Sequence, residues 1–223
     1  MTDGRGDSVL AAWLRFQTCA RRAIVAGAMA ETAFHSDESF TQEEFWQWLN
    51  ERPRSDINHY ELLNGRIVMT PPAGWPHGRI GAKLIRALDE HASRLKLGIV
   101  CDSSTGFDLP SGDTVEPDVS FISNERLAKG PAPERRKFLR VVPSLVVEIL
   151  SDPAAKRDRT EKKDIYERNA VDEYWLVNPD RREVTVFHLA GGRYGAGVVF
   201  AGGQIVSKLL PTLAIVVDEV FAL

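Results

Sequence analysis

The order of apolar and polar residues along the chain predicts both helices and strands. From residue 77 to residue 96 apolar side chains recur at helical spacing, and Gly98 stops the pattern. Thr41 and Glu44 have the spacing of a capping box, which predicts a short helix over residues 42–51. Two more helices are expected, an alanine-rich one over residues 8–30 and a charged one over residues 152–169.

Short runs of β-branched and aromatic residues predict strands. Two of these runs are joined by Asn64-Gly65, the preferred type I′ hairpin turn. Strands are expected over residues 59–63, 66–69, 98–103, 105–109, 115–122, 145–150, 173–177, 184–189 and 194–200, with a short strand or helix at 215–222. Together these elements indicate an α/β or α+β fold, with a mixed central sheet flanked by helices and antiparallel strands towards the C-terminus.

The length and composition suit a globular protein. A chain of 223 residues can form one domain with an appendage. It has no run of about 18 apolar residues, so a membrane span is not expected. Cys19 and Cys101 form no CxxC pair, which argues against a disulfide scaffold or a thiolate zinc site and favours the cytoplasm. Because the formal net charge is -3, any surface that binds nucleic acid must be a local patch.

Glu148 is an acid within an otherwise apolar strand. The run Leu145-Val146-Val147-Glu148-Ile149-Leu150 is typical of a strand that is buried on both faces. An unpaired carboxylate in such a strand would cost several kcal/mol or would have a raised pKa. We therefore expect a cation, a metal ion or a strong hydrogen-bond donor beside Glu148.

A second acid, Asp118, follows Pro117 in the run predicted to form the strand over residues 115–122. Alternation along the two strands places Asp118 and Glu148 on faces that can meet if the strands are neighbours. Two carboxylates held close together repel each other unless a divalent cation lies between them, and hard oxygen ligands suit Mg²⁺ or Mn²⁺. The alternative for each acid is an ordinary salt bridge.

A lysine in the charged helix can reach these acids. A spacing of four places Asp158, Lys162 and Tyr166 on one face of the helix. If that face meets the sheet, the Lys162 ammonium could orient a water molecule or stabilise charge on a phosphorane-like transition state. If it faces solvent, the same residues form a hydrated surface with an Asp158–Lys162 pair.

Two segments rich in lysine and arginine, residues 125–140 and 156–168, flank the candidate acids in sequence. Such segments can contact a phosphate backbone. A hydrated charged surface is the favoured explanation for each segment taken alone, and no motif that reads bases is present.

Several short motifs, taken in order, resemble the Uma-two family of restriction-endonuclease-like proteins, which lies in the PD-(D/E)XK superfamily. The motifs are Tyr60-Glu61-Leu62 with Asn64-Gly65, Pro117-Asp118, Pro143 to Ser151, Asp158-Arg159 with Glu161-Lys162 and Tyr166, and Glu173 to Val177 before Pro179. The resemblance implies a restriction-endonuclease-like domain over residues 41–223. Residues 1–40 would then be an N-terminal extension, helical or partly disordered.

The resemblance also implies roles for individual residues. Asp118 matches the aspartate of the PD motif, and Glu148 matches the acid of the (D/E)XK motif. The lysine of that motif would stand two residues after Glu148, where this chain has Leu150. The family pattern implies that Lys162, in the following helix, takes its place.

Two further positions match the family pattern near the start of the domain. Glu61 matches an acid, and His77 matches a histidine that opens the first long helix. A solvated side chain is the alternative for Glu61, and a packing or capping role is the alternative for His77.

These observations predict a Mg²⁺- or Mn²⁺-dependent nuclease that hydrolyses phosphodiester bonds, with DNA as the expected substrate. The expected catalytic residues are Glu61, Asp118, Glu148 and Lys162. The expected metal ligands are Asp118, Glu148 and the Ile149 carbonyl. The sequence leaves the oligomeric state open, with a homodimer as one option, since many nucleases of this type pair to cut two strands.

Two alternatives to an active nuclease remain open. The fold could be retained as a catalytically inactive module that binds nucleic acid or a protein partner. It could also serve as an oligomeric scaffold, with the apolar tail over residues 205–221 as the contact.

Overall fold

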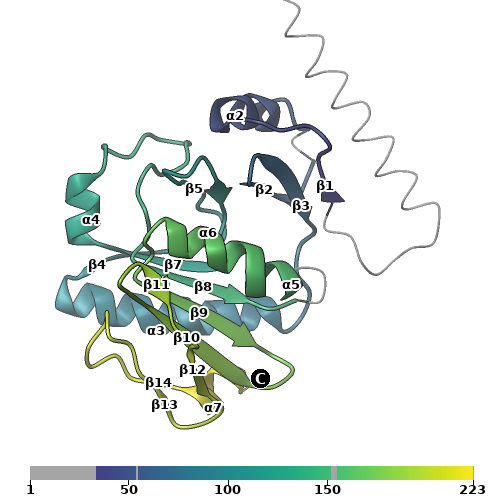
Figure 1. Ribbon diagram of the computed structural model, residues 1–223. Helices are drawn as coiled ribbons and strands as arrows, with labels where there is room; N and C mark the ends of the chain where they lie inside the picture. Colours follow the sequence, from purple (N-terminus) through teal and green to yellow (C-terminus); the bar gives the residue numbers. More distant parts are fainter. Residues whose placement is uncertain (1–33, 54, 152–154, 223) are drawn as a thin grey trace, which may run out of the picture.

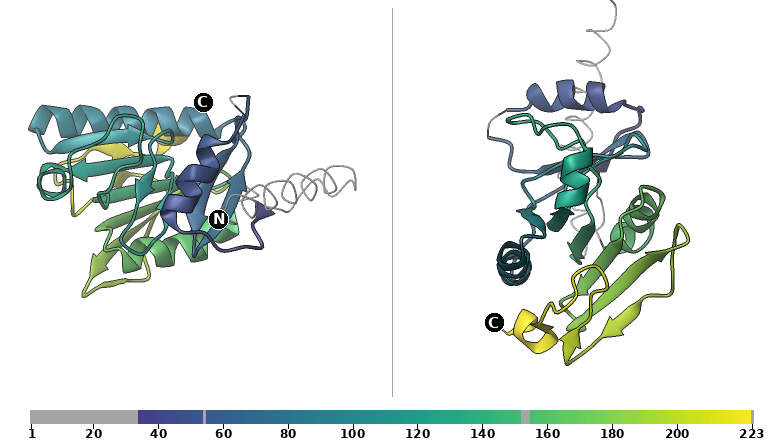
Figure 2. Two further views of the ribbon diagram at one scale, coloured as in Figure 1. Left: turned by 90° about the horizontal axis from the view of Figure 1, so that it is seen from above. Right: turned by 90° about the vertical axis from the view of Figure 1, so that its left-hand side faces the viewer.

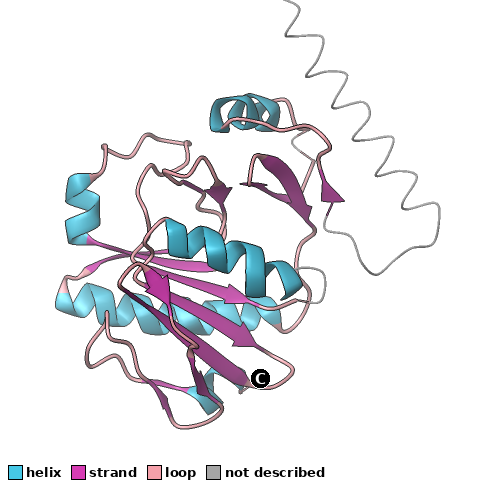
Figure 3. Ribbon diagram, viewed as in Figure 1, coloured by secondary structure: helices cyan, strands magenta, loops and turns pink. Residues whose placement is uncertain are grey.

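A computed structural model describes residues 34–53, 55–151 and 155–222. Within these residues, helices and strands form a mixed α/β fold (Figures 1 and 3). The helix expected over residues 8–30 lies outside the described residues. None of the described helices has the length and hydrophobicity needed to cross a lipid bilayer.

A small sheet is built around the predicted hairpin. Its strand order is β1-β3-β2-β6-β5, and these strands span Phe34–His35, Arg66–Thr70, His59–Leu63, Thr114–Val115 and Phe107–Asp108. Asn64 and Gly65 have φ angles of 52° and 76°, as a type I′ turn requires. The hairpin prediction is therefore confirmed. β1 belongs to the segment that the sequence analysis assigned to the extension, and it pairs with β3.

Helix α2 (Gln42–Asn50) covers the outer face of the small sheet (Figures 1 and 2). The predicted capping box is present, because the Thr41 side chain accepts from Glu44 N–H and the Glu44 carboxylate accepts from Thr41 N–H. Phe45 and Trp48 bury the inner side of this helix against Tyr60, Leu62 and Ile67 of the hairpin. The opposite face of the small sheet carries Glu61 and Leu63 and faces the rest of the domain.

The large sheet is mixed, as the sequence predicted. Its strand order is β11-β10-β9-β8-β7-β4, with β12 beside β10. The strands span Gly98–Asp102 (β4), Val119–Ser123 (β7), Leu145–Ile149 (β8), Glu173–Asn178 (β9), Glu183–Ala190 (β10), Arg193–Tyr194 (β11) and Val198–Phe200 (β12). β8 and β9 run parallel, and the other pairs are antiparallel.

Helices cover both faces of the large sheet (Figure 1). On one face, α3 (His77–Leu95) packs Ile80, Leu84 and Leu88 against the sheet, and the C-terminal elements β13 (Gln204–Ile205), β14 (Ile215–Val216) and α7 (Val217–Phe221) join the same core. On the other face lies α6 (Lys163–Arg168), with Ile165 and Tyr166 buried. Helix α4 (Asn124–Lys129) was not predicted from the sequence.

Two predicted strands are each divided in the structure. The expected strand over residues 115–122 is wrong as one element, because β6 ends at Val115 in the small sheet and β7 starts at Val119 in the large sheet. Pro117 lies in the break and has no N–H for a ladder hydrogen bond. The expected strand over residues 194–200 is divided into β11 and β12, with Gly197 at a φ of 80° between them.

The charged helix predicted over residues 152–169 consists of three parts. Helix α5 (Ala155–Arg157) leads into a π-helical stretch, η1 (Asp158–Lys162), and then into α6. Short π-helical stretches inside α-helices are rare and occur frequently at functional sites. Both ends of η1, Asp158 and Lys162, are buried.

Glu173, at the start of β9, accepts hydrogen bonds from residues 207–209 and so holds this C-terminal segment against the large sheet. Its Oε1 accepts the backbone N–H groups of Lys208 (2.6 Å) and Leu209 (2.8 Å). Its Oε2 accepts from Trp175 Nε1 (3.0 Å) and Ser207 Oγ (2.8 Å). Glu173 is 1% exposed, so water could not replace its carboxylate as the acceptor for these donors.

We expect Glu173→Ala to lower the free energy of unfolding by about 3 kcal/mol or more, because buried donors without an acceptor cost about 1–3 kcal/mol each. Urea denaturation followed by circular dichroism measures this loss. Glu183→Ala, on the neighbouring strand and partly exposed, is the matched control and should change stability by less than about 1 kcal/mol. Equal stabilities of the two variants would contradict the role assigned to Glu173.

Candidate active site

The predicted acids meet in a cleft between the two sheets. The cleft has a volume of about 270 Å³ and is lined from β2, β3, the start of α3, the 116–118 break, the end of β8 and the helix η1. We call it the acidic cleft, because its walls carry the carboxylates of Glu61, Glu116, Asp118, Glu148 and Asp158. Sequence-distant segments therefore supply one concentrated site of negative charge.

Glu148 lies on β8 with 4% of its surface exposed. Its Oε1 contacts the Lys162 ammonium at 2.6 Å and accepts the Tyr166 hydroxyl at 2.5 Å. Burial raises the pKa of the Glu148 carboxyl well above its usual value, and the Lys162 ammonium opposes that shift. A cation, a metal ion or a strong donor was expected beside this buried acid, and the structure places a cation, Lys162, and a donor, Tyr166, there.

Lys162 connects the two sheets through its ammonium group. Its Nζ lies 2.9 Å from Glu61 Oε1 on the small sheet as well as 2.6 Å from Glu148 Oε1 on the large sheet. Burial alone would lower the pKa of Lys162, but Glu148, Glu61 and Asp158 raise it above its usual value, so the ammonium stays charged. Lys162 is 3% exposed, and the alternative of a hydrated helix face is therefore wrong at this position.

Asp118 lies in the break between β6 and β7 and faces the end of β8. Since Val119 pairs with Val147 in an antiparallel register, Asp118 is opposite Glu148 at the next position. The Asp118 Oδ2 accepts the Ile149 backbone N–H at 2.7 Å. The predicted convergence of the two acids thus has a backbone basis, although Asp118 precedes the strand rather than belonging to it.

His77, the first residue of α3, is positioned against Asp118. Its Nε2 lies 3.1 Å from Asp118 Oδ2. Burial lowers the pKa of His77, but hydrogen bonds to Asp118 and to the backbone of Ile149, together with the charge of Asp118, raise it overall. A partner that fixes a carboxylate in this way is common around metal ligands. His77 therefore hydrogen-bonds to Asp118 and to the Ile149 backbone, and these bonds fix the position of Asp118.

Glu116 and His59 were not identified from the sequence. The Glu116 N–H donates to Glu61 Oε1 (2.9 Å), and its Oε2 lies 3.1 Å from His59 Nδ1. Burial raises the pKa of the Glu116 carboxyl, and the hydrogen bond to Glu116 raises the pKa of His59. Neither residue carried a local signal, since one precedes a proline and the other begins a hairpin strand.

Asp158 and Arg157 complete the wall of the cleft at the start of η1. Asp158 is 3% exposed, and burial raises its pKa to about 6. The Arg157 guanidinium donates through Nη2 to Thr70 Oγ1 at 3.1 Å. From the sequence, Asp158 was expected on the Lys162 face of the helix and in a family motif, and Arg157 only within the basic segment 156–168; neither was expected to be a site residue.

The oxygen atoms between the two sheets suit a hard divalent cation. Asp118 accepts through Oδ2 and Glu148 through Oε1, so among the described residues nothing donates to Asp118 Oδ1 or Glu148 Oε2. Mg²⁺ is commonly held by one or two carboxylates, with water and substrate oxygens completing its shell. No three His, Cys, Asp or Glu side chains within residues 34–53, 55–151 and 155–222 form a metal site on their own. The residues therefore fit an ion that shares its shell with water and substrate.

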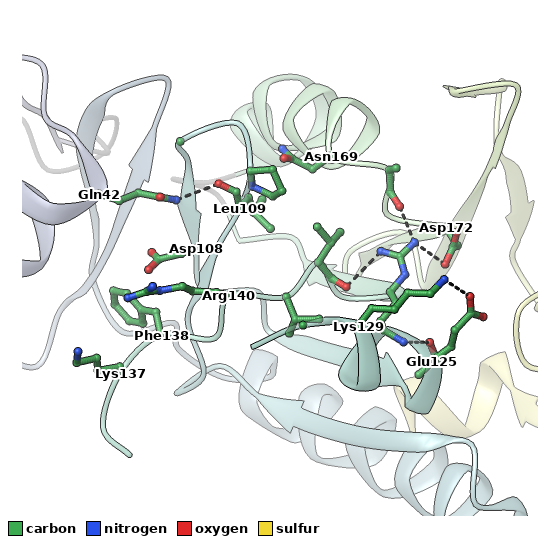
Figure 4. A pocket seen from close by; sticks show the side chains of 18 of the residues that line it. Gln42, Asp108, Leu109, Glu125, Lys129, Lys137, Phe138, Arg140, Asn169 and Asp172 are labelled. Atoms are coloured by element: carbon green, nitrogen blue, oxygen red, sulfur yellow. Dashed lines mark hydrogen bonds and ion pairs between the residues drawn. The ribbon is translucent and has the colours of Figure 1, made fainter. Parts of the chain in front are cut away.

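The lysine- and arginine-rich segment 125–140 lines a separate concavity of about 1170 Å³ (Figure 4), which shares none of its lining residues with the acidic cleft. Charges in its wall are largely balanced. Lys129 pairs with Glu125 at 2.6 Å, and Arg126 pairs with Asp172 at 2.8 Å. This larger concavity offers charged groups already paired with each other, so we assign the candidate chemistry to the smaller acidic cleft.

Comparisons with known proteins agree with this fold. A solved structure titled a "putative nuclease belonging to DUF820", from Anabaena variabilis, superposes with a TM-score of 0.66. It is 17% identical, and the match covers 82% of this chain and 97% of that chain. No curated protein matches the sequence.

A family model gives the more specific result. The model named Uma2, described as "Putative restriction endonuclease", matches residues 42–218. The match includes every residue of the acidic cleft named above and most of the chain. The chain therefore belongs to the Uma2 family of restriction-endonuclease-like proteins.

Proposed function

We propose that the protein is a Mg²⁺- or Mn²⁺-dependent nuclease that hydrolyses phosphodiester bonds in DNA at the acidic cleft. The observation that carries the proposal is the placement of Asp118 opposite Glu148, with the charged Lys162 ammonium 2.6 Å from Glu148. The family description and the nuclease-like fold support nuclease activity in general. The metal is inferred from the chemistry of the cleft, and the DNA substrate from the family's description as restriction endonucleases.

Asp118, Glu148 and the Ile149 carbonyl are the groups that would hold the ion. When bound, the ion would polarise the phosphate and lower the pKa of a coordinated water. His77 fixes the orientation of Asp118 through its hydrogen bond to Oδ2. The Ile149 N–H also donates to Oδ2, which leaves Oδ1 for the ion.

Lys162 would act as the fixed positive charge next to the reacting phosphate. Its contacts with Glu61 and Glu148 hold the ammonium in one place. An ammonium has three N–H groups, so one remains to orient a water molecule or a phosphate oxygen. Glu61 supports this arrangement as a positioning residue, because its Oε1 accepts from both Lys162 and the Glu116 N–H.

We expect Asp118→Asn to abolish divalent-ion-dependent DNA cleavage, because the amide keeps the shape of the side chain and removes its charge. Nicking of a plasmid and cleavage of a single-stranded oligonucleotide, each in Mg²⁺, Mn²⁺ or EDTA, measure the activity. The matched control is Asp89→Asn on the exposed side of α3, which should cleave at the wild-type rate.

Two results would contradict the proposal. Equal cleavage by the wild type and Asp118→Asn would show that the activity comes from a contaminant. Salt-dependent DNA binding by the wild type, without cleavage in any divalent ion, would indicate the inactive binding module instead.

A further inference from the structure

The acidic cleft carries more negative than positive charge. Its walls hold five carboxylates, from Glu61, Glu116, Asp118, Glu148 and Asp158, against two permanently charged side chains, Lys162 and Arg157. A phosphodiester is itself an anion, so such a cleft repels it unless cations are placed to receive it. One divalent ion offsets only part of this excess. A cationic donor that can still accept a partner is therefore needed.

Lys162 has little capacity left for a substrate anion. Lys162 is 3% exposed, and its ammonium already contacts the carboxylates of Glu61 and Glu148 at 2.9 and 2.6 Å. A third strong partner could use only one N–H, and the two carboxylates already balance the charge. Lys162 links the two sheets and has one N–H left for a single oxygen atom, so it cannot by itself position a nucleic-acid strand.

Arg157 has donors to spare. It is 8% exposed, and only its Nη2 has a partner, the Thr70 hydroxyl. Its Nε and Nη1 are buried and have no acceptor among the described residues, which leaves three N–H groups without one. A guanidinium remains charged at any physiological pH, and each buried donor without an acceptor is costly. Such an arginine in the wall of a functional cleft indicates an anionic ligand.

We propose that the Arg157 guanidinium binds a non-bridging oxygen of a phosphate in the nucleic-acid backbone and so positions the substrate strand in the acidic cleft. The inference rests on the proposed function, since it takes the ligand to be that nuclease substrate. The Thr70 hydroxyl accepts from Nη2 and sets the plane of the guanidinium. Nη1, or Nε on the opposite edge of the guanidinium, then donates to the phosphate oxygen. Arg157 thus recognises the backbone and not the bases.

Oligonucleotide binding tests this inference without requiring cleavage. Fluorescence anisotropy of a labelled single-stranded oligonucleotide, measured in Mg²⁺ with all proteins carrying Asp118→Asn, gives the dissociation constants. We expect Arg157→Gln to weaken binding about 10- to 100-fold, as for loss of a charge-assisted hydrogen bond. Arg157→Lys, which keeps the charge but not the planar fork, should give an intermediate loss. Arg159→Gln, exposed two residues away, is the control and should change binding less than about twofold.

A modified substrate distinguishes a phosphate contact from a structural role. Replacing one phosphate at a time by an uncharged methylphosphonate should weaken binding by the protein with Arg157 at one position of the strand. At that position Arg157→Gln should show no further loss, because both changes remove the same contact. Additive losses at every position would overturn the inference. So would variants that melt earlier but bind the oligonucleotide as before.

Each failure can be assigned to its cause. If the wild type cleaves DNA and Arg157→Gln has the same KM and kcat, the role of Arg157 is overturned and the proposed nuclease activity stands. Binding through Arg157 without cleavage by the wild type would overturn the nuclease and leave the role of Arg157 intact. If Arg157→Gln does not fold, Arg157→Lys decides, because wild-type affinity in that variant would overturn the proposal.

Discussion

DNA cleavage by the Glu148→Gln variant is expected to fall about a thousandfold or more. Glutamine keeps the volume of the buried side chain and can still accept from Tyr166, but it has no charge to hold a cation. The loss of one fixed electrostatic group in an enclosed site typically costs about 10²–10³ in rate, and Glu148 has two such roles. It is a proposed metal ligand, and it is also the nearer of the two carboxylates that hold Lys162.

Two measurements check this prediction. Cleavage time courses give the rate, and isothermal titration with Mn²⁺ gives the affinity for the ion. Glu90→Gln, on the exposed side of α3, is the matched control and should behave as the wild type in both. Cleavage by Glu148→Gln within tenfold of the wild type, with Mn²⁺ affinity unchanged, would remove Glu148 from the proposed site.

The Lys162→Met variant is expected to lose about 3–5 kcal/mol of its free energy of unfolding at pH 7. Methionine is long and apolar and fills much of the same space, so the loss comes from charge rather than volume. Glu61 and Glu148 would remain buried without the ammonium that now lies within 3 Å of both. Removing one partner of a buried ion pair is strongly destabilising for this reason.

The loss should also depend on pH in a defined direction. Burial already raises the pKa of Glu148 in the folded protein, and without Lys162 it would rise further. A folded carboxyl with a raised pKa binds more protons than the unfolded one, so stability falls as the pH rises above the unfolded value of about 4.3. Lys162→Met should therefore be least destabilised near pH 4 and most destabilised near neutrality.

Urea denaturation at pH 4, 5.5 and 7 measures both effects. Lys156→Met, an exposed residue in α5, is the control and should change stability by less than about 0.5 kcal/mol. The double variant Lys162→Met with Glu148→Gln should recover part of the loss, since it no longer buries that unpaired charge. A Lys162→Met protein as stable as Lys156→Met would show that the buried pair contributes nothing.

Elements with strong local patterns could be predicted from the sequence. The Asn64-Gly65 hairpin, the capping box at Thr41 and helix α3 were all confirmed, because turn chemistry, capping and periodicity act over a few neighbouring residues. The apolar run around Glu148 correctly indicated a buried strand with a compensated acid. The Uma2 family, resembled by motifs along most of the chain, is confirmed by the family model.

Features that depend on how distant segments meet could not be predicted in this way. The break at residues 116–118 separates two sheets, and nothing in the local pattern shows that the chain changes sheets there. Glu116, His59 and Arg157 enter the cleft only because β2, the break and η1 come together. Leu150, at the usual lysine position, packs in the apolar core. The predicted replacement, Lys162, is in contact with Glu148, and its catalytic role remains a prediction.

The contact of one ammonium with carboxylates on two different sheets has a consequence for the newly made protein. Glu61 is synthesised early, whereas Lys162 follows only after the first three strands of the large sheet, and β8 then needs β9 as its parallel neighbour. A nascent chain on the ribosome therefore holds the early acids without the lysine. The acidic cleft is therefore complete only after β9, when most of the domain has been synthesised.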